Sequence, residues 1–384
     1  MVAATRETLA RRHDAVRVAL RAAGLDALVV THLPNIFFLT GFTGTAGILV
    51  LTPAGARLLV DFRYVTVAEG LLAAGGWPGG ELVRVSGSYD EAALAEIEGG
   101  TYARVGCEAD SLVVGRYQWF SARLTPGVEL VPTHGLIEGV RVRKDADEIA
   151  TLRAAARLLS EVAHDVLRLV QPGPSEQEFA ALIDYKLKSA GFTRPAFETI
   201  VAAGANAALP HARPEGRRLQ SGDLVLLDFG GVYDGYCVDL SRTVCLGRPD
   251  DEMRRVFDAV AQAQRAALSA VRPGVAAADI DASARDVLVE RGLGEMFGHG
   301  TGHGLGIEIH EAPRVAPLRP APAGPDEAKP AGARTETIEA GMVFTVEPGA
   351  YVPGWGGVRL EDDVLVTADG CEVLTDVPRT LEVR

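Results

Sequence analysis

The sequence lacks several features that would assign it to common classes of protein. It has no basic excess: its 384 residues carry a formal net charge of −13, which argues against nucleic acid as a partner because phosphate contacts need a basic surface. It has no run of about 18 apolar residues, so we expect neither a membrane-spanning helix nor a membrane partner. No GxGxxG motif follows an expected strand, which excludes a dehydrogenase.

Cysteine is also scarce. None of the four cysteines forms a CxxC pair, and we expect reduced thiols buried as small apolar side chains: Cys107, Cys237, Cys245 and Cys371. The first thirty residues do not fit a signal peptide, because the apolar stretch LDALVV comes late and no small-residue cleavage site follows it. These features together predict a cytoplasmic protein.

The residues that are present suggest two domains with a large core. Apolar residues make up 47% of the chain. In the first third, short apolar segments alternate with helix-like ones, which predicts an α/β domain with mixed strand pairing. Asp145 can cap a long helix that runs to Pro172. We therefore place the boundary close to 140 and expect the domains to be 1–140 and 141–384.

The second part of the chain alternates helices and strands. Amphipathic patterns predict helices, and Ser175 with Glu178 fits a capping box; the segments are 175–191, 251–271 and 277–292. Apolar runs predict strands at 224–246, 342–352 and 357–367. Residues 313–335 carry six prolines and few apolar residues, so we predict a loop there.

Three of the eight histidines fall within HGTGHGLGIEIH, residues 299–310. Each of the four glycines costs a helix about 1 kcal/mol relative to alanine, so this is not the helical HExxH zinc motif. In an extended stretch His299 and His303 share a face, whereas His310 needs a bend or bulge to join them. A single histidine is most often an ordinary core or surface residue, but three in one glycine-rich stretch indicate a site.

Two acids lie within the apolar strands at 224–246. An unpaired buried carboxylate costs several kcal/mol, so Asp228 and Asp239 each need a cation or a proton. If the turn between them centres on Tyr233 and Asp234, they face each other directly. If it centres on Asp234 and Gly235, they are diagonal neighbours. Both registers put the two carboxylates on one face of the hairpin.

Two further acids complete a possible metal-binding set. Glu347 lies in the apolar run MVFTVEPG, although it could equally be an edge or turn residue. Glu361 precedes Asp362 and Asp363, and spacing alone does not select one of the three. About four carboxylate charges would balance two divalent cations, and one imidazole makes Mn, Co, Fe or Zn acceptable. Two such metals can share a water and lower its pKa, so the pattern indicates a metal-activated hydrolase.

The order of these residues resembles the metal site of the pita-bread metallopeptidases, family M24. The flanking segments are similar to the Xaa-Pro peptidases, the aminopeptidase P and prolidase group; they are LLDFGGVYDGYCVDLSRT, GHGTGHGLGIEIHE, MVFTVEPGAYVP, GGVRLEDD, ALPHARP, FFLTGFTGTAG and DFRY. The resemblance covers nearly the whole chain. It implies an α/β (α+β) fold, with an N-terminal mixed α/β creatinase-like domain followed by a pita-bread catalytic domain with a curved antiparallel sheet.

The resemblance also implies ligands, cofactors and assembly. It implies two divalent metal ions, with Mn²⁺ preferred and Co²⁺ or Zn²⁺ as alternatives, and a homodimer. One metal would be held by Asp228, both would be bridged by Asp239 and Glu361, and the other would be held by His303 and Glu347.

Four more side chains would act around the metals. The resemblance implies that His211, His299 and His310 contact substrate or handle protons. Arg359 would support the acidic cluster, the alternative being an ordinary surface arginine.

The implied reaction is hydrolysis of the bond between an N-terminal residue and a following proline in short peptides. The proline nitrogen in that bond carries no N–H that could hydrogen-bond to a peptidase, and a metal site does not need one. Our hypothesis is that a hydroxide bridging the metals attacks the carbonyl carbon. His310 would help to stabilise the oxyanion, Glu347 would pass the proton on to the proline nitrogen, and His211 would help to form the proline pocket.

Several alternatives stay open at this point. An arginine of segment 313–335 could bind the carboxylate of a dipeptide, but Arg314, Arg319 and Arg334 cannot be placed, so dipeptidase and aminopeptidase P are not separated. The segment itself would either narrow the entrance or form a surface insertion. A catalytically inactive pita-bread binding protein, or a metal-free enzyme such as creatinase, predicts lost ligands, and all five are present. Methionine aminopeptidase usually lacks a first domain of this size.

Overall fold

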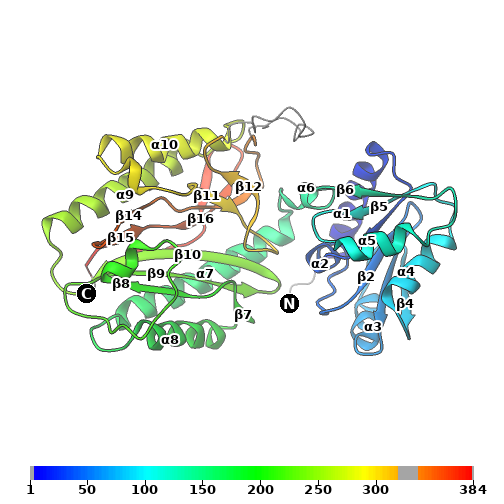
Figure 1. Ribbon diagram of the computed structural model, residues 1–384, viewed down its shortest axis with the longest axis horizontal. Coiled ribbons are helices and arrows are strands. Elements are labelled where there is room, and N and C mark those ends of the chain that lie inside the picture. Colours follow the sequence, from blue (N-terminus) through cyan, green and yellow to red (C-terminus); the bar gives the residue numbers. More distant parts are fainter. Residues whose placement is uncertain (1–3, 319–335, 383–384) are drawn as a thin grey trace. The chain divides into compact units, whose positions relative to one another are not determined.

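The computed structural model describes residues 4–318 and 336–382. The chain forms two compact units, Met1–Arg141 and Val142–Arg384 (Figure 1). Across the described ranges, no helix combines the length and the apolar character that crossing a membrane would require.

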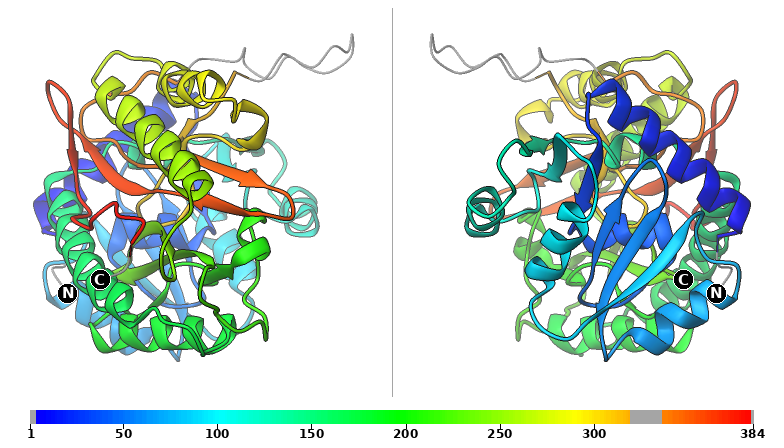
Figure 2. Two further views of the ribbon diagram at one scale, coloured as in Figure 1. Left: turned by 90° about the vertical axis from the view of Figure 1, so that its left-hand side faces the viewer. Right: turned by 90° about the vertical axis from the view of Figure 1, so that its right-hand side faces the viewer.

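A six-stranded sheet forms the centre of the first unit, and its strand order is β4-β3-β2-β1-β5-β6. The right-hand view of Figure 2 shows strands and helices of this unit, coloured blue to cyan. The strands are β1 (Ala27–Val30), β2 (Ile48–Leu51), β3 (Ala56–Asp61), β4 (Gly80–Val85), β5 (Arg104–Glu108) and β6 (Glu129–Thr133). Strand β1 pairs antiparallel with β2 and parallel with β5, so the pairing is mixed, as the sequence predicted. All four residues of β1 are buried, which means that both faces of the sheet are covered.

The helices of this unit are α1 (Arg6–Ala22), α2 (Leu33–Thr40), α3 (Val65–Ala73), α4 (Tyr89–Glu98), α5 (Val114–Ser121) and α6 (Glu138–Arg141). Ala93 and Ile97 of α4 and Phe120 of α5 pack against the sheet. Helix α2 was not predicted, because it is apolar nearly all round and so shows no amphipathic period. Pro34 in its first turn and Gly41 at its end, with φ 73°, are the local signals that define it.

Four long helices surround the sheets of the second unit: α7 (Ala146–Leu169), α8 (Glu176–Ser189), α9 (Asp251–Ala270) and α10 (Ala277–Glu290). Both predicted caps are present, because Asp145 with Glu148 and Ser175 with Glu178 each form a complete capping box. Figure 1 shows α9 and α10 on one side of the strands and α8 on the other. Buried alanines and valines of α9 pack against β13, β14 and β15.

The described part of the second unit holds three groups of strands. In the first, β9 (Leu224–Tyr233) lies between β10 (Tyr236–Cys245) and the short strands β7 (Arg194–Pro195) and β8 (Ile200–Ala203). The second has the order β12-β11-β13-β16-β17, with β11 (Gly302–Gly304), β12 (Glu311–Val315), β13 (Val343–Val346), β16 (Asp362–Val366) and β17 (Cys371–Val373). The third pairs β14 (Gly349–Val352) with β15 (Gly356–Arg359). All these pairs are antiparallel, which confirms the predicted class of fold.

Two predicted strands are each broken in two. The run 342–352 divides into β13 and β14, and the run 357–367 divides into β15 and β16, with the halves in different sheets. Pro348 has no N–H to continue the β13 ladder, and the Glu347 N–H turns to the carbonyl of Thr301 at 2.7 Å. Glu347 and Glu361 therefore both lie where the chain passes from one sheet to another.

The predicted loop at 313–335 was wrong at its start. Residues up to Val315 belong to β12, an edge strand whose register shifts opposite His303 and Gly304. Proline is tolerated at such an edge and beside such a bulge because no ladder hydrogen bond needs its nitrogen, which is why Pro313 fits there. The rest of that prediction, from 319 to 335, lies outside the described residues.

Candidate metal centre

The β9–β10 hairpin sets the relation between the first two acids. Asp234 and Gly235 form its turn with φ values of 48° and 87°, and two positive φ angles are the mark of a type I′ turn. Tyr233 consequently pairs with Tyr236, which selects the diagonal one of the two predicted registers. Asp228 lies opposite Ser241 and Asp239 lies two positions further along on the same face. Both carboxylates are buried.

Close approach of strands places His303 beside these acids. A Cβ on Gly302 would lie 1.8 Å from the carbonyl oxygen of Thr345, so only glycine lets β11 come this near to β13. The His303 N–H then donates to the Thr345 hydroxyl at 3.1 Å. The imidazole Nε2 lies 3.6 Å from Glu347 Oε1 and 4.0 Å from Asp239 Oδ2. Gly302 therefore has a packing role, because it lets the strand that carries His303 lie close to β13.

The predicted ligands converge on one cavity of about 670 Å³. Ligand atoms of Asp239, His303 and Glu361 all lie within 4.8 Å of one another. All nine predicted site residues line this cavity: Asp228, Asp239, His211, His299, His303, His310, Glu347, Arg359 and Glu361.

The charge balance of the cavity shows whether these side chains suit a cation. Burial raises the pKa of Glu347 to about 8 and the pKa values of Asp239 and Glu361 well above their ordinary range, with neighbouring carboxylates adding to the effect. Burial also lowers the pKa of His303 to about 4, which keeps its imidazole neutral, the form that binds metal. Asp228 Oδ1 is buried without a hydrogen-bond donor in the described part of the chain. This donor set fits divalent cations.

The structure separates the three consecutive acids that spacing could not. Glu361 alone of the three lines the cavity. Asp362 turns away and pairs with Arg242 and Arg379. Asp363 accepts a hydrogen bond from the Asp239 N–H at 3.0 Å. Each acid therefore has a different set of partners, although all three are buried.

The other histidines lie around the same cavity. The rings of His303 and His310 are 4.4 Å apart between centroids, after the chain bends between them and β12 bulges, as the sequence analysis required. His211 and His310 are exposed. His299 is enclosed: its Nδ1 lies 2.8 Å from the Gly300 carbonyl, its Nε2 lies 2.9 Å from the Tyr351 hydroxyl, and burial lowers its pKa to about 4.

Arg359 is not a surface residue, so that alternative was wrong. It is 3% exposed, and its guanidinium donates to Asp228 Oδ2, to the Tyr351 hydroxyl at 2.7 Å and to Ser241 Oγ at 2.9 Å. Tyr351 and Ser241 were not among the residues predicted from the sequence. Ser241 Oγ in turn donates to Glu361 Oε2 at 2.7 Å, which links the arginine to the carboxylate. The position of Ser241 opposite Asp228 in the hairpin is the one signal that could have identified this serine.

The chain is similar to known proteins over most of its length. Residues 150–368 match metallopeptidase family M24, and residues 12–143 match the creatinase/prolidase N-terminal domain. An Xaa-Pro dipeptidase of Pyrococcus horikoshii is 32% identical over 93% of this chain and 94% of its own length. The structure of an Xaa-Pro dipeptidase from Bacillus anthracis superposes with a TM-score of 0.89 at 34% identity, covering 97% of this chain and 99% of that one. An X-Pro aminopeptidase structure from Thermotoga maritima gives a TM-score of 0.83 at 29% identity, covering 95% and 100%. These matches confirm the resemblance that the motifs indicated.

Proposed function

The chain belongs to metallopeptidase family M24, and on that premise we propose that it hydrolyses the bond between an N-terminal residue and a following proline in short peptides. The observation that carries the proposal is the convergence of Asp228, Asp239, His303, Glu347 and Glu361 on one cavity that three further histidines also line. The relatives named for Xaa-Pro dipeptides support the choice of substrate.

The proposal includes two divalent cations, with Mn²⁺ preferred and Co²⁺ or Zn²⁺ as alternatives. Oxygen ligands with a single imidazole suit these ions. Asp228 would hold one ion and His303 with Glu347 the other, while Asp239 and Glu361 would be shared. When bound, such a pair of ions lowers the pKa of a water between them and polarises the scissile carbonyl.

The side chains of the cavity supply the remaining steps. The Glu347 carboxylate takes the proton that the attacking water loses and delivers it to the proline nitrogen, which leaves as a secondary amine. His310 donates a hydrogen bond to the carbonyl oxygen as negative charge develops there. His211, with Phe197 and Ile200 of the same cavity, encloses the proline ring. The missing N–H on proline does not weaken substrate binding, because the proposed site uses no hydrogen bond from that nitrogen.

Arg359 and its partners hold this arrangement in place. Its hydrogen bond to Asp228 Oδ2 occupies that oxygen and leaves Oδ1, which has no hydrogen-bond partner among the described residues, as the oxygen that would bind a cation. Its contact with the Tyr351 hydroxyl also fixes the oxygen that meets His299 Nε2. His299 therefore presents a neutral, oriented ring to the substrate.

Arg314 supports a preference for dipeptides. Of the three arginines considered in segment 313–335, it is the one that the structure describes, and it lies opposite His303 in β12 and lines the cavity. Its side chain is exposed and forms no ion pair within residues 4–318 and 336–382. A guanidinium so placed can bind the carboxylate of a C-terminal proline, so we assign the dipeptidase activity to this chain.

A comparison of substrates tests the proposed function. Ala-Pro and Ala-Pro-Ala are each offered to metal-stripped enzyme, and then with Mn²⁺, Co²⁺ or Zn²⁺ added back. We expect metal-dependent cleavage of the dipeptide alone. Cleavage of the tripeptide as well would assign an aminopeptidase P instead. Failure to cleave either peptide with any metal would overturn the peptidase and favour a catalytically inactive binding protein.

Two further proposals concern the cellular location and the oligomeric state of the enzyme. All four cysteines are free, which supports a reducing, cytoplasmic location. The homodimer that the family resemblance implies is tested by light scattering coupled to size-exclusion chromatography, where a mass near 81 kDa, twice the 40.5 kDa of one chain, is the expected result.

A further inference from the structure

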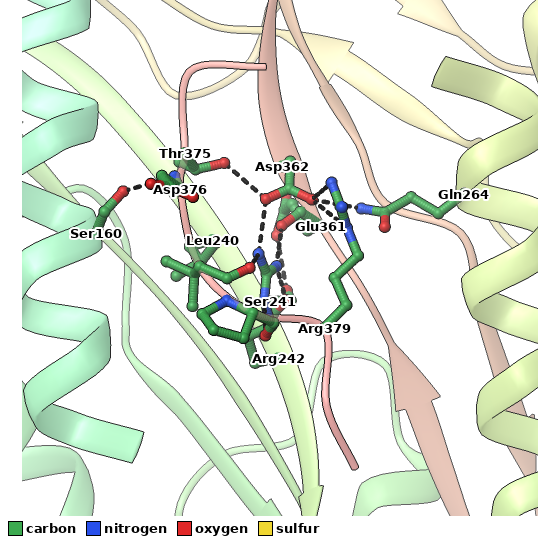
Figure 3. Close-up of polar contacts among 12 residues, drawn as sticks. Ser160, Leu240, Ser241, Arg242, Gln264, Glu361, Asp362, Thr375, Asp376 and Arg379 are labelled. Carbon is green, nitrogen blue, oxygen red and sulfur yellow. Dashed lines mark hydrogen bonds and ion pairs between the residues drawn. The ribbon is translucent and has the colours of Figure 1, made fainter. Parts of the chain in front are cut away.

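A buried ionic cluster is centred on Asp362, the residue that follows Glu361 in the chain (Figure 3). Asp362 is fully buried, yet both of its carboxylate oxygens are satisfied. Oδ1 accepts from Arg242 Nη2 at 2.7 Å and from the Thr375 hydroxyl at 2.8 Å. Oδ2 accepts from Gln264 Nε2 at 2.8 Å and from Arg379 at 2.6 and 3.0 Å. The carboxylate is therefore held in one orientation from four sides.

Arg242 connects this cluster to the backbone of Glu361. Its Nη1 donates to the Glu361 carbonyl at 2.5 Å and to the Ser241 carbonyl at 2.9 Å. Its Nη2 and Nε donate to the carbonyls of Val377 at 2.8 Å and Pro378 at 3.2 Å. One buried guanidinium thus ties the chain at Glu361 to a segment near the C-terminal end of the described residues.

That segment, Thr375–Leu381, is itself anchored at both ends, and we call it the C-terminal strap. At its start the Asp376 N–H donates to Ser160 Oγ at 2.9 Å, and the Asp376 carbonyl lies 2.9 Å from His164 Nε2, both on α7. At its end the Leu381 carbonyl accepts from the Cys245 N–H of β10 at 2.7 Å. Figure 3 shows the strap crossing beside Asp362, with Thr375 and Arg379 reaching that side chain.

These contacts leave Glu361 little freedom. Its N–H donates to the Ser241 carbonyl at 3.1 Å, its own carbonyl is held by Arg242, and its Oε2 accepts from the Ser241 hydroxyl. The next residue, Asp362, is fixed by the cluster. Glu361, which lines the cavity, therefore has a restricted orientation before any ion binds.

We propose that Arg242, Asp362 and Arg379 are positioning residues through which the C-terminal strap sets the orientation of Glu361, so that metal affinity depends on side chains that never touch the metal. The inference rests on the proposed function, because it takes Glu361 as a ligand. Stability alone does not account for the cluster, since well-packed apolar residues often stabilise a folded protein at least as well as buried ion pairs do. Residues that orient metal ligands typically change metal affinity 10- to 100-fold when replaced.

A matched pair of variants separates positioning from stability. Arg379→Met removes the paired contact to Asp362, while Arg217→Met removes a similar two-point contact, at 2.7 and 2.8 Å, to Asp223. The two arginine side chains are similarly accessible, at 31% and 29%, and their acidic partners Asp362 and Asp223 are both largely buried, at 0% and 11% exposed. Arg217 does not line the cavity. We therefore expect the two variants to lower the melting temperature of the metal-free protein by similar amounts.

Isothermal titration of Mn²⁺ into the metal-free full-length protein is the deciding measurement. Arg379→Met should weaken Mn²⁺ binding about 10- to 100-fold, and Arg217→Met should leave it unchanged. Arg379→Lys, which keeps the charge and one contact, should recover part of the loss. Thr375→Val removes one hydroxyl at nearly constant size, so it should weaken Mn²⁺ binding by a smaller factor. It replaces Arg379→Met as the test variant if Arg379→Met does not fold.

Two results would overturn the inference, and they differ from each other. If the unaltered protein binds Mn²⁺ and both Arg379→Met and Thr375→Val bind it equally well, the cluster is only structural and the proposed function stands. If the unaltered protein binds no Mn²⁺, Co²⁺ or Zn²⁺, Glu361 is not a ligand and the proposed metal centre fails together with the inference.

Discussion

Replacing Arg314 should change substrate preference without removing activity. The proposed contact is a charge-assisted hydrogen bond to the proline carboxylate, which typically contributes about 1.5–3 kcal/mol. Because Arg314 is exposed, we take the lower end of that range, about 1.5 kcal/mol. This free energy corresponds to about a tenfold change in substrate affinity. Arg314→Met should therefore lower kcat/KM for Ala-Pro about tenfold, mainly through KM. The chemistry at Glu347 and the metal ligands should be unaffected.

The assay compares Ala-Pro with Ala-Pro-amide, which lacks the carboxylate. Unaltered enzyme should prefer the free acid, and Arg314→Met should treat the two alike. Arg213→Met is the matched control, because Arg213 also lines the cavity but lies 3.7 Å from Glu198. Equal losses on both substrates in Arg314→Met would refute the carboxylate contact. A loss of selectivity in Arg213→Met instead would assign the contact to that residue.

Three further changes test other parts of the argument. Asp239→Asn should abolish cleavage and reduce bound metal, measured by elemental analysis, and activity in that variant would contradict the proposed ligand set. Tyr351→Phe leaves His299 Nε2 and one Arg359 N–H without a partner, so urea unfolding of the metal-free enzyme should show a loss of about 1–3 kcal/mol; no loss would mean that this buried contact is not formed. Burial lowers the pKa of His13 to about 4 from its ordinary 6.5, so the folded state resists its protonation. The contribution of His13 to stability should be full above about pH 6.5 and fall toward pH 4, by up to about 3 kcal/mol, so His13→Gln should lose less stability than the unaltered protein between unfolding curves at pH 7 and pH 4.5.

The hairpin shows how far local rules reach. The alternation of strand side chains puts Asp228 and Asp239 on one face in either register, and the Asp-Gly pair has the residue types that a type I′ turn prefers. The two helix caps are equally local, since each box spans four residues. These parts of the fold and of the candidate site followed from neighbouring residues, and the structure agrees with them.

The strands around Glu347 and Glu361 show where local rules stop. The apolar runs at 342–352 and 357–367 look continuous, because both halves of each run are buried. Which sheet each half joins depends on partners far away in the sequence, such as Thr301 for the Glu347 N–H and Ser241 for the Glu361 N–H. Periodicity carries no information about such partners.

The sequence by itself determined which candidate groups are present: Asp228, Asp239, His303, Glu347 and a run of three acids at 361–363, with further histidines and glycines near His303. Tertiary structure alone decided which of three consecutive acids enters the cavity, and that Arg359 is buried beside it. The physical reason is that burial and charge pairing belong to three-dimensional neighbours: Asp362 is taken by Arg242 and Arg379, 120 and 17 residues away, and Asp363 by the backbone of Asp239. Glu361 is left to face the cavity.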